Sequence, residues 1–243
     1  MKKFHSIAVA VAALSFASNQ ASAQSESWDY RAFIYLWGAA LGGSTTTGQD
    51  IDLDFGDVVD ALDFGLMGSL EANHGALSLL GDFQYLSLSD DANAAVGPGI
   101  PASADAEVDG FVFSGSAGYD FLHSTESQFI AFGGFRYMDL DTTANIAVGN
   151  GSQRISGGLS NVDAIVGLRG SNKINEKWSI SYYGDIGGGD SDLTWQTALT
   201  LDYRINSWDL SFGYRHLAWD VSNSAVLSDL SFSGPFIGAK IPF

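Results

Sequence analysis

The chain has 243 residues, of which 46% are hydrophobic and 13% aromatic, and it contains no cysteine. Its formal net charge is −17, from 11 basic and 28 acidic residues, which argues against nucleic-acid binding because that function needs basic stripes. The missing thiols exclude disulfides, thiolate metal sites and lipoprotein anchoring. Only 4 prolines accompany 29 glycines, a composition that suits one domain of long strands with bends.

The first 23 residues have the pattern of a secretory signal peptide. Lys2 and Lys3 precede an apolar run over 7–16, which is shorter than the roughly 20 residues of a membrane-spanning helix. Ala21-Ser22-Ala23 forms a small-x-small cleavage site, so we expect the mature chain to begin at Gln24. Loss of the two lysines leaves nine basic against 28 acidic residues, a net charge of −19. We expect residues 24–243 to form a single domain.

Apolar and polar residues alternate over long runs, as in strands that have two different faces. Within 111–121, Phe111, Phe113 and Phe121 share one face while Ser114 and Asp120 share the other. Arg and Asp recur on the small, polar face of almost every run, which is typical of a barrel lumen. We therefore predict an all-β fold: a single closed, antiparallel, up-and-down transmembrane β-barrel of about ten strands, with eight and twelve as alternatives. The expected strands are 28–42, 62–73, 76–89, 107–122, 128–141, 157–171, 177–189, 193–205, 207–220 and 228–243.

The connections alternate between short turns and longer segments rich in Gly, Ser, Asn, Thr and Asp. The long segments are expected to be loops on the outer side, and an even strand number then places both termini in the periplasm. One helical turn is expected from Asp57 to Leu62. In the last strand, Leu230 and Phe232 are out of phase with the apolar residues that follow, so we expect a bulge near Gly234-Pro235 that lets both sets face lipid. The expected loops are 43–61, 90–106, 142–156 and 221–227.

Charged residues on inward positions define a predicted lumen charge network. Arginine suits such a network because its planar fork binds carboxylates in a bidentate manner. The network is either a polar conduit or a solid polar core that fixes strand register, and the narrow interior of about ten strands favours the core. Its members are Arg31, Glu71, Asp82, Arg136, Asp163, Arg169, Asp185, Asp202, Arg204, Asp209 and Arg215.

Three of these arginines, Arg136, Arg169 and Arg215, are expected to pair with acids. The predicted partners are Asp163, Asp185, Asp202 and Asp209. Loss of one partner from a buried pair costs about 3–5 kcal/mol, so Arg169→Leu is expected to weaken the barrel. Leu168→Val, on the lipid face of the same strand, is expected to matter little.

Metal and catalytic motifs are weak in this chain. Asp50, Asp52 and Asp54 alternate on one strand face, but the Gly and Glu of an EF-hand loop would fall on Phe55 and Ala61. We interpret this segment as a solvated strand extension above the membrane.

The set His123, Ser124 and Glu126 lies in a compact turn, where adjacent residues do not form a triad. We predict no catalytic, cofactor-binding or metal-binding residues and no cofactor.

Several short motifs resemble those of a family of small Gram-negative outer-membrane barrels, related to the OmpA-type barrel without its peptidoglycan-binding domain. The resemblance implies a barrel fold and an outer-membrane location, and it transfers no catalytic residue. The terminal Phe243 also resembles the assembly signal of such barrels, so we expect the barrel-assembly machinery to read it. The motifs are Phe55-Gly56-Asp57-Val58-Val59, Leu66-Met67-Gly68-Ser69-Leu70-Glu71-Ala72, Gly81-Asp82-Phe83-Gln84-Tyr85-Leu86, Tyr183-Gly184-Asp185-Ile186-Gly187-Gly188, Gly213-Tyr214-Arg215-His216-Leu217 and Gly234-Pro235-Phe236-Ile237-Gly238.

The leading functional hypothesis is a non-enzymatic outer-membrane barrel with a structural, surface-interaction or limited-permeation role. One alternative is an outer-rim enzyme acting on lipid or peptide; His216 with Asp220, and the pair Asp90-Asp91, loosely resemble an omptin-type site. The other alternative is a small-solute channel. Expected partners are outer-membrane lipids, lipopolysaccharide and the assembly machinery, with no nucleic acid. The oligomeric state is left open.

Overall fold

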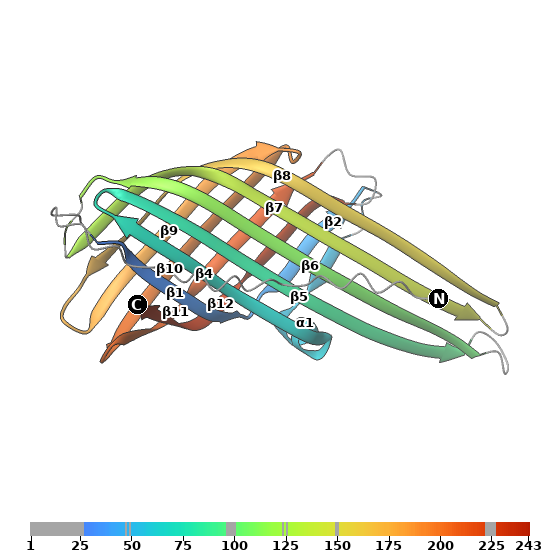
Figure 1. Cartoon of the computed structure of the whole chain (residues 1–243). Coiled ribbons are helices and arrows are strands. Elements are labelled where there is room, and N and C mark those ends of the chain that lie inside the picture. The colour runs from blue at the N-terminus through green and yellow to red at the C-terminus, as the bar shows by residue number, and fades with distance from the viewer. Residues whose placement is uncertain are drawn as a thin grey trace.

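The computed structural model describes residues 27–46, 48, 50–95, 101–122, 124, 126–148, 151–221 and 227–243. The predicted signal peptide and Gln24 lie outside these residues. Within them the chain forms strands and one short helix (Figure 1). The elements are β1 (Asp29–Trp37), β2 (Ala40–Thr45), β3 (Asp50–Leu53), α1 (Phe55–Asp60), β4 (Leu62–His74), β5 (Leu77–Ala95), β6 (Pro101–Asp120), β7 (Ser127–Val148), β8 (Gly151–Lys173), β9 (Trp178–Gly189), β10 (Leu193–Ile205), β11 (Trp208–Asp220) and β12 (Leu227–Pro242).

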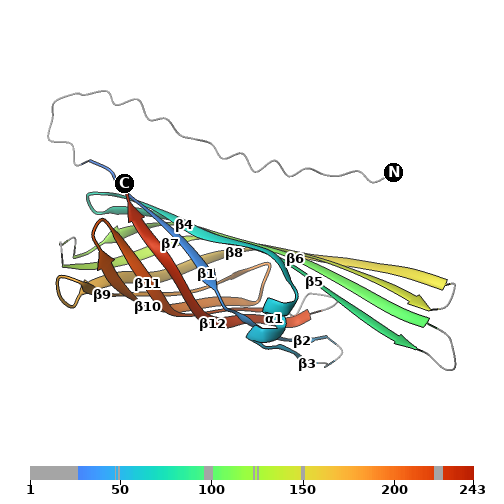
Figure 2. The ribbon, with the colours of Figure 1, turned by 90° about the horizontal axis from the view of Figure 1, so that it is seen from below.

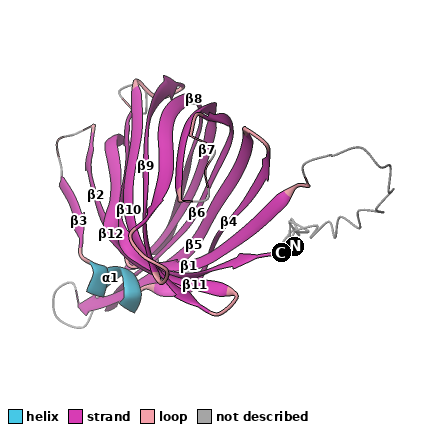
Figure 3. Ribbon diagram, turned by 90° about the vertical axis from the view of Figure 1, so that its left-hand side faces the viewer, coloured by secondary structure: helices cyan, strands magenta, loops and turns pink. Residues whose placement is uncertain are grey.

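The sheet closes on itself because its first and last strands pair. From β4 to β12 each strand pairs antiparallel with the next, β4 also pairs with β1, and β12 completes the ring by pairing with β1 from Arg31↔Pro242 to Trp37↔Phe236. The result is a closed, antiparallel 10-strand barrel with β2 and β3 as additional strands. Figure 3 shows the barrel from the end where the short turns lie. The predicted barrel and its strand number are confirmed.

The first predicted strand is interrupted, and the structure corrects the expected bulge in the last one. β1 ends at Trp37, and β2 continues along the same edge of β12 from Ala40↔Ser233. The register of β11 against β12 runs unbroken through Gly234-Pro235, and the shift lies instead between Leu227 and Asp229. Because the register is unbroken, Leu230 and Phe232 share the inward face with Phe236. They do not face lipid.

Two of the predicted outer loops are in fact strands. β5 runs on to Ala95, β6 begins at Pro101, β7 reaches Val148 and β8 begins at Gly151, so most of 90–106 and 142–156 is paired sheet. β9 pairs with β8 only from Asp163 to Lys173. The far parts of β5 to β8 therefore project beyond the barrel wall as a sheet, which we call the extension (Figure 2). Its sequence is rich in Gly, Ser and Asn, as loops are, but its strands are paired in register with their neighbours.

The helix α1 connects β3 to β4. Asp54 caps it: its side chain accepts a hydrogen bond from the Asp57 amide, and the Asp57 side chain accepts one from the Asp54 amide, forming a capping box. The helical turn predicted from Asp57 to Leu62 thus begins two residues earlier. Among the described residues no helix is long and apolar enough to cross a membrane.

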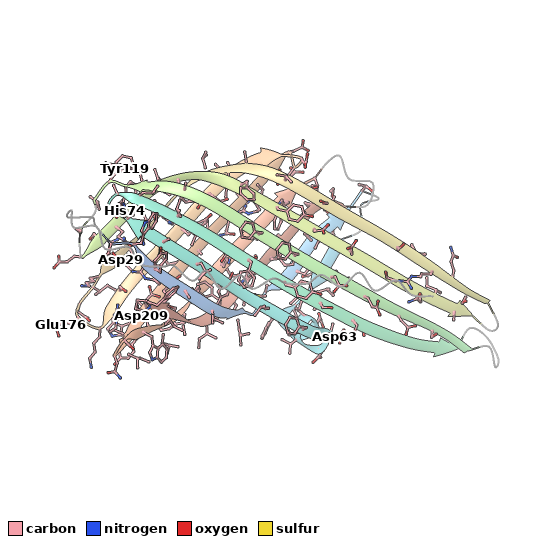
Figure 4. All side chains as sticks on the ribbon, viewed as in Figure 1. Asp29, Asp63, His74, Tyr119, Glu176 and Asp209 are labelled. Atoms are coloured by element: carbon pink, nitrogen blue, oxygen red, sulfur yellow. The ribbon has the colours of Figure 1, made fainter. Side chains whose placement is uncertain are left out.

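The outward face of the barrel is an exposed apolar belt. Side chains such as Leu79, Phe135, Val166, Leu199 and Phe212 are exposed there, as the alternation predicts for a lipid-facing surface. The short turns gather at one end of the barrel (Figure 4). Labelled residues at that end are Asp29, His74, Tyr119, Glu176 and Asp209.

Candidate functional site

The middle of the lumen holds a fully buried ion pair. Arg136 on β7 contacts Asp185 on β9 at 2.5 Å, and neither side chain is accessible to solvent. The same guanidinium donates to the hydroxyls of Thr194 at 2.9 Å and Ser114 at 3.2 Å and to the Gln196 amide oxygen at 3.4 Å. Since these partners come from three strands, β6, β9 and β10, the network ties separate parts of the barrel wall together.

A second ion pair crosses the lumen beside the first. Arg215 on β11 contacts Asp82 on β5 at 2.7 Å and donates to the Tyr35 hydroxyl at 2.6 Å. Its guanidinium also lies 5.2 Å from the Trp37 ring, a cation–π distance. Gln196 accepts a hydrogen bond from Arg215 at 2.8 Å, so it joins both pairs into one layer.

Above this charged layer, toward the extension, apolar side chains meet across the lumen. Val112 and Met138 on one wall pack with Leu217, Trp219 and Leu230 from the opposite wall, and all are buried. Trp219 lies 5.9 Å from the Arg136 guanidinium. The cluster was not predicted, because in the sequence an apolar residue on inward parity looks like a lipid-facing residue out of phase. The partly buried side chains around it are Trp37, Leu41, Leu140, Leu159 and Phe232.

Below the charged layer lies a cavity of about 190 Å³, on the side of the short turns. Arg31, whose side chain is 42% exposed, lines it near the end of β1, so the cavity is reached from the short-turn end. Arg169 on β8 lines its wall and is 6% exposed. Arg169 donates to the hydroxyls of Ser78 at 2.7 Å and Ser116 at 3.1 Å.

The remaining members of the predicted network form smaller groups. Arg31 pairs with Glu71 at 3.1 Å, and Arg204 pairs with Asp209 at the rim. Asp202 is bound by Lys240 at 2.8 Å, a lumen residue that the sequence reading did not include.

Among the ion pairs of the described residues, only that of Arg136 with Asp185 joins one of the three arginines to a predicted acid partner. Arg215 pairs with Asp82, which was not among those partners. Among the described residues Arg169 has no carboxylate within ion-pair distance, and its charge is met by serine hydroxyls instead. Asp163 is fully buried but accepts hydrogen bonds from the Ser191 amide at 2.9 Å and hydroxyl at 2.8 Å. Asp163 lies directly opposite Arg136 in the β7–β8 register, but the Arg136 guanidinium pairs with Asp185, and the tight turn after β9 supplies the donors to Asp163.

The weak catalytic motifs do not assemble into a site. His216 points outward, lies against the Trp195 ring in a tilted arrangement with centroids 4.4 Å apart and contacts the Ser233 hydroxyl. His123 lies outside the described residues. In the parts of the chain that the structure describes, no group of three or more His, Asp or Glu side chains is placed to hold a metal ion.

A closed barrel with an apolar outer belt and a charged interior defines an outer-membrane β-barrel protein, and its location is the bacterial outer membrane. Solved structures of the same class resemble it. The translocator domain of the autotransporter NalP from Neisseria meningitidis is 13% identical, covers 88% of each chain and gives a TM-score of 0.53. The outer-membrane protease OmpT from Escherichia coli is 12% identical over 91% of this chain and 100% of its own, with a TM-score of 0.48. Ail from Yersinia pestis is 11% identical over 90% and 99%, with a TM-score of 0.38.

At such identities the NalP likeness concerns the fold alone. No protein-family model and no curated protein matches the sequence.

Proposed function

We propose that this protein is a non-catalytic outer-membrane barrel whose role is surface interaction, and that the extension of β5 to β8 carries that role. The observation behind this proposal is the sheet that continues far beyond the closed part of the barrel (Figure 2). It projects from the end opposite the short turns, and short turns belong on the periplasmic side in this class of protein. The extension is then presented outside the cell.

The packing of the lumen disfavours a role in permeation. A small barrel has an interior only wide enough for side chains, and here the Arg136–Asp185 and Arg215–Asp82 pairs fill that width. The apolar cluster around Trp219 and Met138 lies directly above them. A solute would have to break both layers, each of which joins opposite walls.

The outward face of the extension is acidic. Asp105, Glu107, Asp109 and Asp141 are exposed there, and Asp109 lies directly opposite Asp141 in the β6–β7 register. Like charges placed opposite each other weaken a strand pair, so this pattern does not serve stability. It favours a positively charged partner. Before Asp163, β8 pairs with β7 on one side but not with β9 on the other, so it forms an edge of the extension.

Two variants of the protein in vesicles test the role of the extension. The first joins Leu86 to Gly110 and Leu140 to Leu159 through Asn-Gly turns, which keeps the native register while removing the projecting sheet and its four acids. The second keeps the sheet but replaces the acids (D105N, E107Q, D109N, D141N). Vesicles carrying the wild type are expected to bind a polylysine-coated surface at least tenfold better than either variant. Equal binding by all three contradicts the proposal.

Electrical recording separates this role from the small-solute channel. In planar bilayers the wild type is expected to show no conductance steps, because the charged and apolar layers block the lumen. Regular steps from the wild type would favour the channel.

A further inference from the structure

Arg169 is a buried cation that the barrel does not neutralise directly. Its side chain lies on the inward face of β8, is 6% exposed and packs 5.5 Å from the Phe132 ring. Its two terminal nitrogens each donate to a serine hydroxyl across the lumen, while its Nε is buried without a hydrogen-bond partner. A guanidinium carries five N–H donors, so most of this one's capacity is unused by the protein.

The carboxylates nearest to Arg169 are engaged elsewhere. Glu71 accepts a hydrogen bond from Ser78 at 3.4 Å but forms its ion pair with Arg31. Asp82 is paired with Arg215. Asp120, two strands away in register, accepts hydrogen bonds from the amides of Leu122 and Phe129 at the turn.

The cavity in front of Arg169 has an excess of positive charge. Its wall carries the cations Arg31, Arg169, Arg215 and Lys240. Arg31, Arg215 and Lys240 are paired with Glu71, Asp82 and Asp202, so the excess is the charge of Arg169. This contrasts with the whole chain, whose net charge is −17. A buried cation without a paired acid lowers stability, so its retention in a cavity points to a ligand that supplies the missing charge.

We infer that the cavity on the short-turn side binds a small oxyanion, a carboxylate or a phosphate, at Arg169. Each terminal nitrogen keeps a second N–H beyond its serine bond, and a guanidinium can bind two oxygens of such a group at once. The Ser116 hydroxyl, which accepts a bond from Arg169, has its own hydrogen to donate to the same anion. The volume of about 190 Å³ admits a small organic acid or phosphate and excludes a polymer.

Calorimetric titration of the folded barrel in zwitterionic vesicles tests this site with inorganic phosphate and with acetate, each at matched ionic strength in chloride. The wild type is expected to bind at least one of them saturably, and Arg169→Met is expected to bind it at least tenfold more weakly. Arg204→Met is the matched control, because it removes an arginine from the rim without touching the cavity. The site is refuted if the wild type binds neither anion, or if Arg169→Met binds as tightly as the wild type.

Ser78→Ala tests the same site should Arg169→Met fail to fold. Ser78→Ala removes the strongest hydrogen bond to Arg169 and its link to Glu71, so it frees another donor for the anion. Its affinity is expected to rise at least threefold. An unchanged or weaker affinity would overturn the assignment. The result is independent of the extension, which lies at the other end of the barrel.

Discussion

Arg136 on β7 and Asp185 on β9 meet at 2.5 Å in the middle of the lumen, with both side chains sealed from solvent. The pair lies between two different environments. On one side is the cavity that holds Arg169, and on the other is the apolar cluster under Trp219. The pair therefore separates the two ends of the barrel. It also holds together the strands whose side chains accept hydrogen bonds from Arg136.

Arg136→Leu is expected to destabilise the barrel by about 3–5 kcal/mol, because it leaves Asp185 as a buried charge without its partner. Arg204→Leu removes a rim arginine that is half exposed, and exposed pairs contribute only about 0–1 kcal/mol. Urea unfolding in lipid vesicles measures both. Equal losses in the two variants would show that the central pair is not buried as the structure has it.

Arg169→Met is expected to change the free energy of unfolding by no more than about 1 kcal/mol, because replacing a buried, unpaired cation with an apolar side chain removes a desolvation penalty. This reverses the expectation from sequence, which assumed an acid partner and a large loss. Leu168→Val, exposed on the lipid face of the same strand, serves as the reference. A loss of several kcal/mol in Arg169→Met alone would restore the ion-pair hypothesis. The measurement is the same vesicle unfolding assay.

The alternation of residue types was enough to predict the barrel and the inward parity of its arginines. A lipid-facing arginine costs about 2–4 kcal/mol at the bilayer midplane, so Arg136 and Arg215 had one acceptable side. No such cost decides the side on which Leu230 lies, because lipid and an apolar lumen cluster are equally good surroundings for leucine. Alternation also cannot distinguish a polar strand in water from a loop, which is why the extension was missed.

Which charged residues pair in the lumen could not be predicted from the sequence. Arg215 contacts Asp82, which is 133 residues away along the chain and on the opposite wall. Such contacts depend on the stagger with which the barrel closes, and no local pattern encodes it. Lys240 already had inward parity in the sequence but was left out of the predicted network, and its partner Asp202 was expected to bind arginine.

Gly234→Ala is expected to destabilise the barrel by about 1–3 kcal/mol through overpacking. Gly234 faces inward at the bend between β1 and β2, and a Cβ there would overlap the carbonyl oxygen of Gly38. That backbone cannot withdraw freely, because the Gly38 amide donates to the Pro235 carbonyl at 2.8 Å. Gly184→Ala is the control, since a Cβ at that position meets no atom within 4 Å. Unfolding midpoints that fall equally in both variants would contradict the close approach.

Deletion of Phe243 is expected to impair assembly while leaving the stability of the assembled barrel almost unchanged. Phe243 is 72% exposed and follows the last strand, and its amide donates to the Tyr30 carbonyl at 3.0 Å. Its ring stacks on Tyr30 with centroids 5.8 Å apart, so the fold gains little from Phe243 beyond these two contacts with Tyr30. A terminal aromatic side chain with so small a structural role fits a signal read by the assembly machinery. The heat-resistant folded fraction in cell membranes, measured on gels without boiling, is expected to fall severalfold on deletion. Tyr30→Ala removes the ring contact but keeps the terminal residue, so it is expected to assemble normally. If Tyr30→Ala lowers the folded fraction as much as the deletion, the terminal residue acts through the ring contact and not as a signal.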